Sequence, residues 1–314
     1  MLAKIKGNFV EGKNRMSLIE ACYLLEKGKI EVERDGEKIN FEDFLKYSIS
    51  VFNDFEIKYL VYRDLRERGY IAEIGEDFLL YERGKKSPAK PSFFVKAISE
   101  RAKFRIKDII DWLSDLDKKI VIGIVDEEGD LTYYSIKFFE MKSDIKKENY
   151  SGNIWVLNDR SVVFDEQLIN KIKEEGIGRD FGKYVQISLM ETAYMAKNGA
   201  VLIKDGNKIS FEDFMKNAKY IQPDIKERLK VYEDLKNKGK LPKTGFKFGS
   251  HFRVYEGKIE EHAPYLVHVI KNNYTATWAE VSRAVRLAQS VKKEMIFAVA
   301  GKEIKYIRIK RITP

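Results

Sequence analysis

Apolar and polar residues follow two kinds of pattern along the chain, and both kinds are found in each half. The earlier part of each half, residues 17–70 and 188–240, predicts mainly helices, which begin at capping residues and end at glycines. Later segments of the second half show apolar runs or alternation, which predict strands: FRVY at 252–255, APYLVHVI at 263–270, EMIFAVA at 294–300 and IKYIRIKR at 304–311. One helix interrupts these strands, from Thr277 to about Ser290, because Glu280 completes a capping box with Thr277.

Capping and turn residues mark the ends of the earlier helices. Ser17 and Ser188 are each followed three residues later by Glu, and Gly28 and Gly199 stand where such helices end. Asp-Gly turns then predict a short strand pair in each half, and the sequence FEDF begins a second helix. A third, charged helix follows.

The two halves of the chain are copies of one another. DGEKINFEDFLK at 35–46 matches DGNKISFEDFMK at 205–216 in nine of twelve positions. YLVYRDLRERGY at 59–70 answers LKVYEDLKNKGK at 229–240. We therefore expect an α+β protein with two tandem copies of one unit, each a helix-rich N-terminal subdomain followed by an α/β subdomain with a mixed sheet.

A polar stretch near 148–152 marks the expected boundary between the copies. The first repeat is then residues 1–148 and the second is residues 149–314, with subdomains at 149–240 and 241–314. A length of 314 residues suits about two domains.

Composition narrows the class of protein. A single cysteine, Cys22, excludes a disulfide framework and a cysteine-based metal cluster. Since no apolar run approaches the ~18 residues of a membrane span and the polar N-terminus is not a signal peptide, we expect a reduced, cytoplasmic protein. The net charge of +9 suits an anionic partner such as nucleic acid, although many soluble proteins are basic.

All three histidines lie in one 18-residue segment of the second repeat, 251–268. His262 follows a loop after Tyr255, so a hairpin would bring both to one site, and Lys293 lies where a helix gives way to a strand. Without paired carboxylates such a set binds metal poorly, but it suits proton transfer beside a phosphate. For each residue alone, a structural role is the commoner explanation. We assign structural roles to His251 and His268, and the exchange of Asp77 for His251 suggests a surface position.

Basic residues extend the contrast between the repeats. Arg286 precedes Lys293 by seven residues, and Arg308 lies in a strand rich in Lys and Arg, which suits either RNA contact or a solvated edge. Tyr255 and Lys293 are answered by residues of the same type in the first repeat, Tyr81 and Lys119. His262, Arg286 and Arg308 are answered by residues of other types, which are Lys90, Trp112 and Ser135. Core packing does not predict such a coordinated loss.

An acidic loop distinguishes the first repeat. DEEGD at 126–130 carries Asp126, Glu127, Glu128 and Asp130, where the second repeat has AGKE at 300–303. Opposite charges on the two copies suggest pairing, within the chain or between chains, although an exposed turn is an equal alternative.

Two long segments resemble the archaeal tRNA-splicing endonuclease family. They are VYEDLKNKGKLPKTGFKFGSHFRVYEGKIEEHAPYLVHVI and RAVRLAQSVKKEMIFAVA, and the first repeat's YLVYRDLRERGY with GEDFLLY resembles the same family. The resemblance covers nearly the whole chain. His251 stands where the family more often has Asp, and the loop from Tyr255 to His262 is short.

The resemblance implies a nuclease-like fold, the two-repeat homodimeric type and a role for each residue. Tyr255 would be the general base, His262 the general acid, and Lys293, or Lys292 if the register slips, the transition-state cation. Arg286 and Arg308 would clamp a flipped-out bulge base, and the loop 126–130 would dock on the neighbouring subunit. Such enzymes cut precursor tRNA at both intron ends in a bulge–helix–bulge structure. They leave 2′,3′-cyclic phosphate and 5′-hydroxyl ends and use no metal or other cofactor.

Two other classes of function remain open. A non-catalytic RNA-binding or scaffold subunit would suit the first repeat, which lacks the histidine. A general basic nucleic-acid-binding protein would bind RNA without cutting it, with a strong salt dependence. Neither explains why the complete set of reactive residues is confined to one repeat.

Overall fold

The computed structural model describes residues 2–81, 91–115, 119–141, 148–256 and 262–314. The chain forms two compact units. The first comprises 1–137, 275–281 and 310–314, and the second comprises 138–274 and 282–309. These units do not follow the repeats residue for residue, because two short segments of the second repeat belong to the first unit. The repeat boundary near 148–152 stays a prediction from the sequence.

The first unit begins with a small subdomain of strands and helices. Strands β1 and β4 pair in parallel, and the others pair antiparallel, in the order β3-β2-β1-β4-β5. A second set of strands follows, in the order β11-β10-β8-β7-β6. The elements of the first repeat are β1 (Leu2–Lys6), β2 (Phe9–Glu11), β3 (Arg15–Ser17), α1 (Leu18–Glu26), β4 (Glu31–Arg34), β5 (Glu37–Ile39), α2 (Phe41–Val51), α3 (Phe55–Glu67), β6 (Ala72–Ile74), β7 (Phe78–Leu80), β8 (Phe93–Ser99), β9 (Lys103–Arg105), α4 (Ile106–Asp115), β10 (Lys119–Val125) and β11 (Leu131–Phe138).

The second repeat has the same plan, and its described residues add helix α5, the short strand β14 and a 3₁₀ turn. Helix α5 is inserted between its second and third N-terminal strand regions, where the first repeat has only a short connection. Its elements are β12 (Asn153–Val156), β13 (Arg160–Val163), α5 (Glu166–Glu174), β14 (Arg179–Asp180), β15 (Val185–Ser188), α6 (Leu189–Lys197), β16 (Val201–Lys204), β17 (Asn207–Ile209), α7 (Phe211–Ile221), α8 (Ile225–Asn237), β18 (Leu241–Thr244), a 3₁₀ turn (Phe246–Phe248), β19 (Phe252–Tyr255), β20 (Tyr265–Ile270), β21 (Thr275–Thr277), α9 (Trp278–Ser290), β22 (Glu294–Ala300) and β23 (Ile304–Ile312).

Local sequence signals explain most of these boundaries. The capping box of α6 is complete, since Ser188 accepts from the amide of Glu191 and the Glu191 carboxylate accepts from the amide of Ser188. Both residues of the turn between β4 and β5 have positive φ, 54° at Asp35 and 92° at Gly36. This is the backbone of a tight hairpin turn, and Asp205 and Gly206 repeat it.

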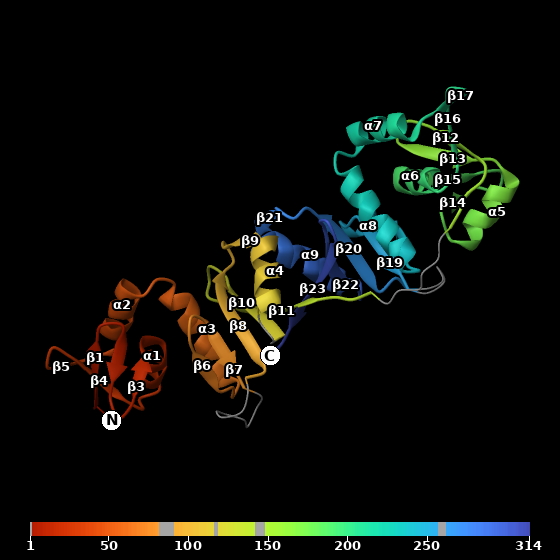
Figure 1. Ribbon diagram of the computed structural model, residues 1–314. Helices are drawn as coiled ribbons and strands as arrows, with labels where there is room; N and C mark the ends of the chain where they lie inside the picture. The colour runs from red at the N-terminus through yellow and green to blue at the C-terminus, as the bar shows by residue number, and fades with distance from the viewer. Residues whose placement is uncertain (1, 82–90, 116–118, 142–147, 257–261) are drawn as a thin grey trace. The chain divides into compact units, whose positions relative to one another are not determined.

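Helices α3 and α8, which are equivalent in the two repeats, join the N-terminal subdomain to the larger sheet. In the second unit α8 contacts α6 and α7 on one side and β18, β20 and β22 on the other (Figure 1). Tyr306 of β23 donates a 2.6 Å hydrogen bond to Asp234 of α8, and Tyr133 of β11 donates an equal one to Asp64 of α3. The first repeat therefore keeps the internal framework of the second.

Candidate active site

Three of the chain segments singled out by sequence meet at one end of a sheet. In the second unit β19 runs antiparallel to β20, and β20 runs parallel to β22. Tyr255 ends β19, while β20 and β22 begin at Tyr265 and Glu294, which are paired in register. The end of β19 and the approaches to β20 and β22 consequently lie at the same sheet edge.

Lys293 is tied directly to the segment that contains His262. Its Nζ donates a 2.5 Å hydrogen bond to the carbonyl oxygen of Ala263, the residue after His262. Burial, and then the positive charge of Arg253, lower the pKa of Lys293. Lys292 is exposed and has φ 57°, the left-handed conformation in which α9 ends. The structure therefore places Lys293, and not Lys292, against the histidine segment.

Tyr255 is 7% exposed and packs with Leu241 and Ala263. Its counterpart Tyr81 donates a 2.6 Å hydrogen bond to Glu73, and that bond raises the pKa of Tyr81. Among the described residues, the Tyr255 hydroxyl has no such carboxylate partner. Within the described ranges, the hydroxyl of Tyr81 therefore has a carboxylate partner and that of Tyr255 does not.

His262 itself is exposed and stands one residue before Ala263. Most of the loop that precedes it, residues 257–261, lies outside the described residues. The structure brings the main chain beside His262 to Lys293 and Tyr255, and with the described part of the chain the His262 side chain makes no hydrogen bond or ion pair.

Arg253 is a residue that the sequence comparison did not single out. Its guanidinium carbon lies 5.7 Å from the centre of the Tyr255 ring, and its charge acts on Lys293. Its Nε is buried, and no described residue forms a hydrogen bond with it. In the first repeat Leu79 stands here, so FLLY against FRVY was the available signal.

Arg308 lies on the other face of the sheet from Arg253 and Tyr255, and Arg286 lies on α9. The register pairs Arg308 with Ile296, so by strand alternation Arg308 shares the sheet face of Glu294 rather than that of Arg253 and Tyr255. Arg308 forms a 2.8 Å ion pair with Glu294. Arg286 is exposed on α9, whose buried side is formed by Trp278, Val281, Val285 and Ala288.

The prediction of a surface position for His251 is wrong. Its side chain is 16% exposed, and its Nδ1 accepts a 2.8 Å hydrogen bond from the amide of Val269. The equivalent Asp77 is 6% exposed and accepts from the equivalent amide, that of Ala97. A buried backbone N–H needs an acceptor, and each repeat supplies a different one.

His251 also stacks on His268, with ring centres 4.4 Å apart. Burial lowers the pKa of His268. Burial, and then the charge of His268, lower the pKa of His251 to about 3. Lys96, the counterpart of His268, instead forms a 2.7 Å ion pair with Asp77. The prediction of structural roles for both histidines fits this arrangement.

Strand register corrects one of the proposed counterparts, and helix burial corrects another. Val121 pairs with Val95 and Ile296 with Val267, which places Lys119 level with Glu294 and leaves Lys118, outside the described residues, as the counterpart of Lys293. In the helices, Ile106 and Ile109 of α4 are buried like Trp278 and Val281 of α9. That match aligns Arg286 with Ser114 rather than Trp112. Lys90, the proposed counterpart of His262, is also outside the described residues.

The acidic loop joins β10 to β11 and is built around one of its own carboxylates. Asp126 accepts hydrogen bonds from the amides of Glu128 and Asp130, at 3.0 and 2.9 Å. Glu127 pairs with Arg101. Glu127, Glu128 and Asp130 are exposed. Three carboxylates therefore face outward, and the fourth shapes the turn.

Comparison with known proteins places this arrangement in a family. Residues 55–133 and 225–306 match the profile of the tRNA intron endonuclease catalytic C-terminal domain. Residues 9–45 and 156–215 match that of the tRNA intron endonuclease N-terminal domain. The chain belongs to the tRNA intron endonuclease family. Both domains of the family are present twice, which confirms the predicted duplication and its α+β class.

Relatives match this chain over most of its length and of their own. A tRNA-splicing endonuclease of Methanococcoides burtonii is 38% identical over 320 residues, which cover 95% of this chain and 90% of that protein. Those of Methanosarcina mazei and Natronomonas pharaonis are 35% and 32% identical and cover 95% and 96% of this chain, and 89% and 90% of their own lengths.

Two further observations concern the described part of the chain. No helix there is both long enough and apolar enough to cross a membrane. No group of three or more His, Cys, Asp or Glu side chains gathers there in a way that could hold a metal ion.

Proposed function

We propose that this chain is a tRNA-splicing endonuclease that cleaves precursor tRNA at both intron boundaries in a bulge–helix–bulge structure. The observation that carries the proposal is the junction of Tyr255, Ala263 and Lys293 at one sheet end of a family member. The first repeat lacks the arginine, and its tyrosine donates its hydroxyl hydrogen bond to Glu73, which supports a structural role for that repeat.

The proposed reaction is an internal transfer of the phosphate. Tyr255 takes the proton of the ribose 2′-hydroxyl, the 2′-oxygen attacks the adjacent phosphorus, and the bond from phosphorus to the 5′-oxygen breaks. His262 gives its proton to that 5′-oxygen, and Lys293 stabilises the additional negative charge on the phosphate. The products are a 2′,3′-cyclic phosphate and a 5′-hydroxyl. Since the nucleophile belongs to the same ribose, proximity is built into the substrate, and the step uses no metal-bound water.

Arg286 and Arg308 are proposed to hold an unpaired bulge base, because planar guanidinium groups stack on bases and bind phosphates. We also propose a homodimer, which supplies two complete sites for two splice sites. The exposed carboxylates of the loop 126–130 would dock on the basic surface of the partner.

The test uses an end-labelled precursor tRNA with excess EDTA. Wild-type protein should cut at both intron ends and leave cyclic phosphates, and His262→Ala should cut about 10² to 10⁴ times more slowly with RNA binding retained. Lys293→Met should also slow cleavage, while Lys292→Met, which changes the exposed neighbour, is its matched control. Binding by wild-type protein without cleavage would instead support a scaffold subunit.

A further inference from the structure

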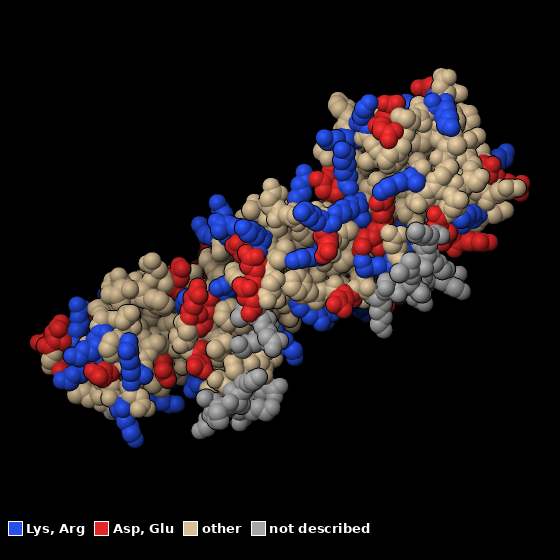
Figure 2. All heavy atoms as spheres, viewed as in Figure 1, with Lys and Arg blue, Asp and Glu red and all other residues tan. Residues whose placement is uncertain are grey.

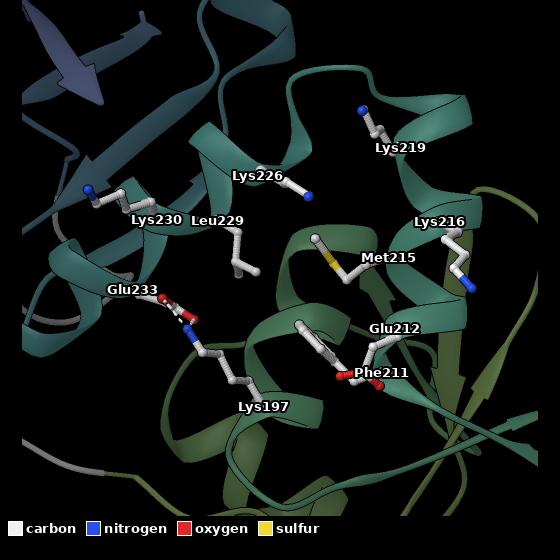
Figure 3. Close-up of a pocket in the computed structure, with 10 residues that line it drawn as sticks. All are labelled: Lys197, Phe211, Glu212, Met215, Lys216, Lys219, Lys226, Leu229, Lys230 and Glu233. Carbon is white, nitrogen blue, oxygen red and sulfur yellow. Dashed lines mark hydrogen bonds and ion pairs between the residues drawn. The ribbon is translucent and has the colours of Figure 1, made fainter. Parts of the chain in front are cut away.

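A basic groove lies in the N-terminal subdomain of the second repeat, between α6, α7 and α8. Its volume is about 770 Å³. On α8, Lys226, Leu229, Lys230 and Glu233 fall at helical positions i, i+3, i+4 and i+7, so they form one face of that helix (Figure 3). None of the lining residues belongs to the set proposed for cleavage.

The groove has an apolar floor and charged walls. Met215 and Leu229 are 9% and 6% exposed and point into the space between the helices, with the half-buried Phe211 beside them (Figure 3). The walls carry charged side chains, of which five are Lys and two are Glu: Lys197, Lys216, Lys219, Lys226, Lys230, Glu212 and Glu233. Figure 2 shows Lys and Arg side chains gathered over α7 and α8.

The lysines of the groove differ in whether a carboxylate of the described residues already pairs with them, and an unpaired lysine can bind an external anion. Lys197 is paired with Glu233 at 2.8 Å, and Lys216 with Asp213 at 3.1 Å. Lys230 donates to the carbonyl oxygens of Gly301 and Lys302, which carry no net charge. Lys219 and Lys226 are exposed, and among the described residues neither has a carboxylate partner.

The fold does not require this charge, as the first repeat demonstrates. Lys197, Lys219, Lys226 and Lys230 are answered by Glu26, Ile49, Glu56 and Leu60. The seven charged wall positions sum to +3 in the second repeat, five Lys against two Glu. Their counterparts sum to −1, from Glu26, Glu42 and Glu56 against Lys46 and Arg63. Helices of the same shape therefore carry opposite net charge, and the basic one belongs to the repeat with the complete reactive set.

An exposed aromatic side chain follows one of these lysines on α7, outside the residues that line the groove. Tyr220 directly follows Lys219 on α7 and is 92% exposed, and Ser50 replaces it in the first repeat. Basic residues beside an exposed aromatic ring are typical of surfaces that follow an RNA backbone and stack an unpaired base. Lysine binds phosphate as a point charge and does not read base edges, so such contact would be independent of sequence.

We infer that this groove is a second RNA-binding surface, which holds backbone phosphates of the precursor tRNA through Lys219 and Lys226. The inference rests on the proposed function for the identity of the RNA. It adds a contact that strengthens substrate binding and takes no part in the chemical step.

The experiment compares Lys219→Ala/Lys226→Ala with Lys183→Ala/Lys208→Ala. The control pair removes two exposed lysines of the same repeat that lie outside the groove. Dissociation constants for precursor tRNA are measured between 0.05 and 0.3 M salt, with single-turnover cleavage at saturating RNA. Loss of two phosphate contacts should lower the salt slope by about 2 and weaken binding on the order of thirtyfold at 0.15 M salt. The cleavage rate at saturation should be unchanged.

Equal affinities and equal salt slopes in the two double variants would overturn the inference, and the groove would then suit an acidic protein better. The two proposals fail separately. If wild-type protein binds the RNA without cutting it, the binding curves still decide the groove, while the cleavage proposal falls. If wild-type protein cuts normally and the groove variants match the controls, only the groove falls. Failure of wild-type protein to bind the RNA at all would overturn both.

Discussion

The stacked histidines of the second repeat predict a stability that depends on pH. His251 has a pKa of about 3 in the folded protein, because it is buried and lies beside His268 and Arg228. An unfolded chain restores the ordinary value of ~6.5. The unfolded state therefore binds more protons between these values, and the stabilising contribution is complete above about pH 6.5 and lost as pH falls toward 3.

The size of the effect follows from the two pKa values. Between pH 7 and pH 5, His251 alone should lower the free energy of unfolding by about 2 kcal/mol. Little of this is lost to solvent screening, since the side chain is 16% exposed. Replacing His251 with Asn removes the proton-binding group but keeps a side-chain oxygen that can accept from the amide of Val269. His268 remains in that variant and keeps its own share of the pH dependence.

The assay is urea unfolding of wild type, His251→Asn and His262→Asn at pH 5 and pH 7. His262→Asn is the control, because it changes an exposed histidine outside the stack. The change in stability from pH 7 to pH 5 should be about 2 kcal/mol smaller in His251→Asn than in the other two. An identical pH dependence in all three proteins would refute the reasoning.

Three further predictions concern the site and its surroundings. Arg253→Leu, which installs the residue of the first repeat, removes a cation beside Tyr255 and Lys293. It should slow cleavage on the order of a hundredfold without lowering the melting temperature. An unchanged cleavage rate would make Arg253 a packing residue. Neutralising Glu127, Glu128 and Asp130 together, with Asp126 kept to hold the turn, should weaken the dimer in sedimentation experiments, and a dimer that persists at nanomolar concentration would contradict the docking role. Arg286→Ala or Arg308→Ala should reduce cleavage of bulged RNA more than binding of unbulged RNA, whereas equal losses would indicate simple phosphate contacts.

Much of the fold could be predicted because its signals are local. The capping boxes at Ser188 and Thr277 depend on residues three positions apart, and the structure contains both. The small N-terminal strands were less accessible. Strands as short as Arg15–Ser17 carry too few positions to show a period.

The sequence indicated most of the residues that meet at the site, but it did not show which of them contact one another. Sequence comparison selects Lys293 but leaves Lys292 open, and only the bond to Ala263 separates them. Arg253 was overlooked because an arginine in an alternating strand normally faces solvent. The surface position predicted for His251 was wrong for a similar reason. Asp77 and His251 accept hydrogen bonds from amides of a neighbouring strand, and the sequence does not show how those two segments lie. Counterparts in a gapped repeat also shift by one or two residues, and register corrects them.

The pairing of β9 with β21 bears on the history of the chain. Phe104 stands opposite Ala276, and these residues occupy the same position in the two repeats, 172 residues apart. If every residue of this ladder is replaced by its equivalent in the other repeat, the same pairs result. The ladder is therefore symmetric about the pair of Phe104 and Ala276. Trp278 packs edge-on against Phe104, 5.1 Å between ring centres. A single-copy ancestor could have formed the same ladder between two identical chains. Fusion of its gene would have preserved that contact and left one copy free to lose its reactive residues.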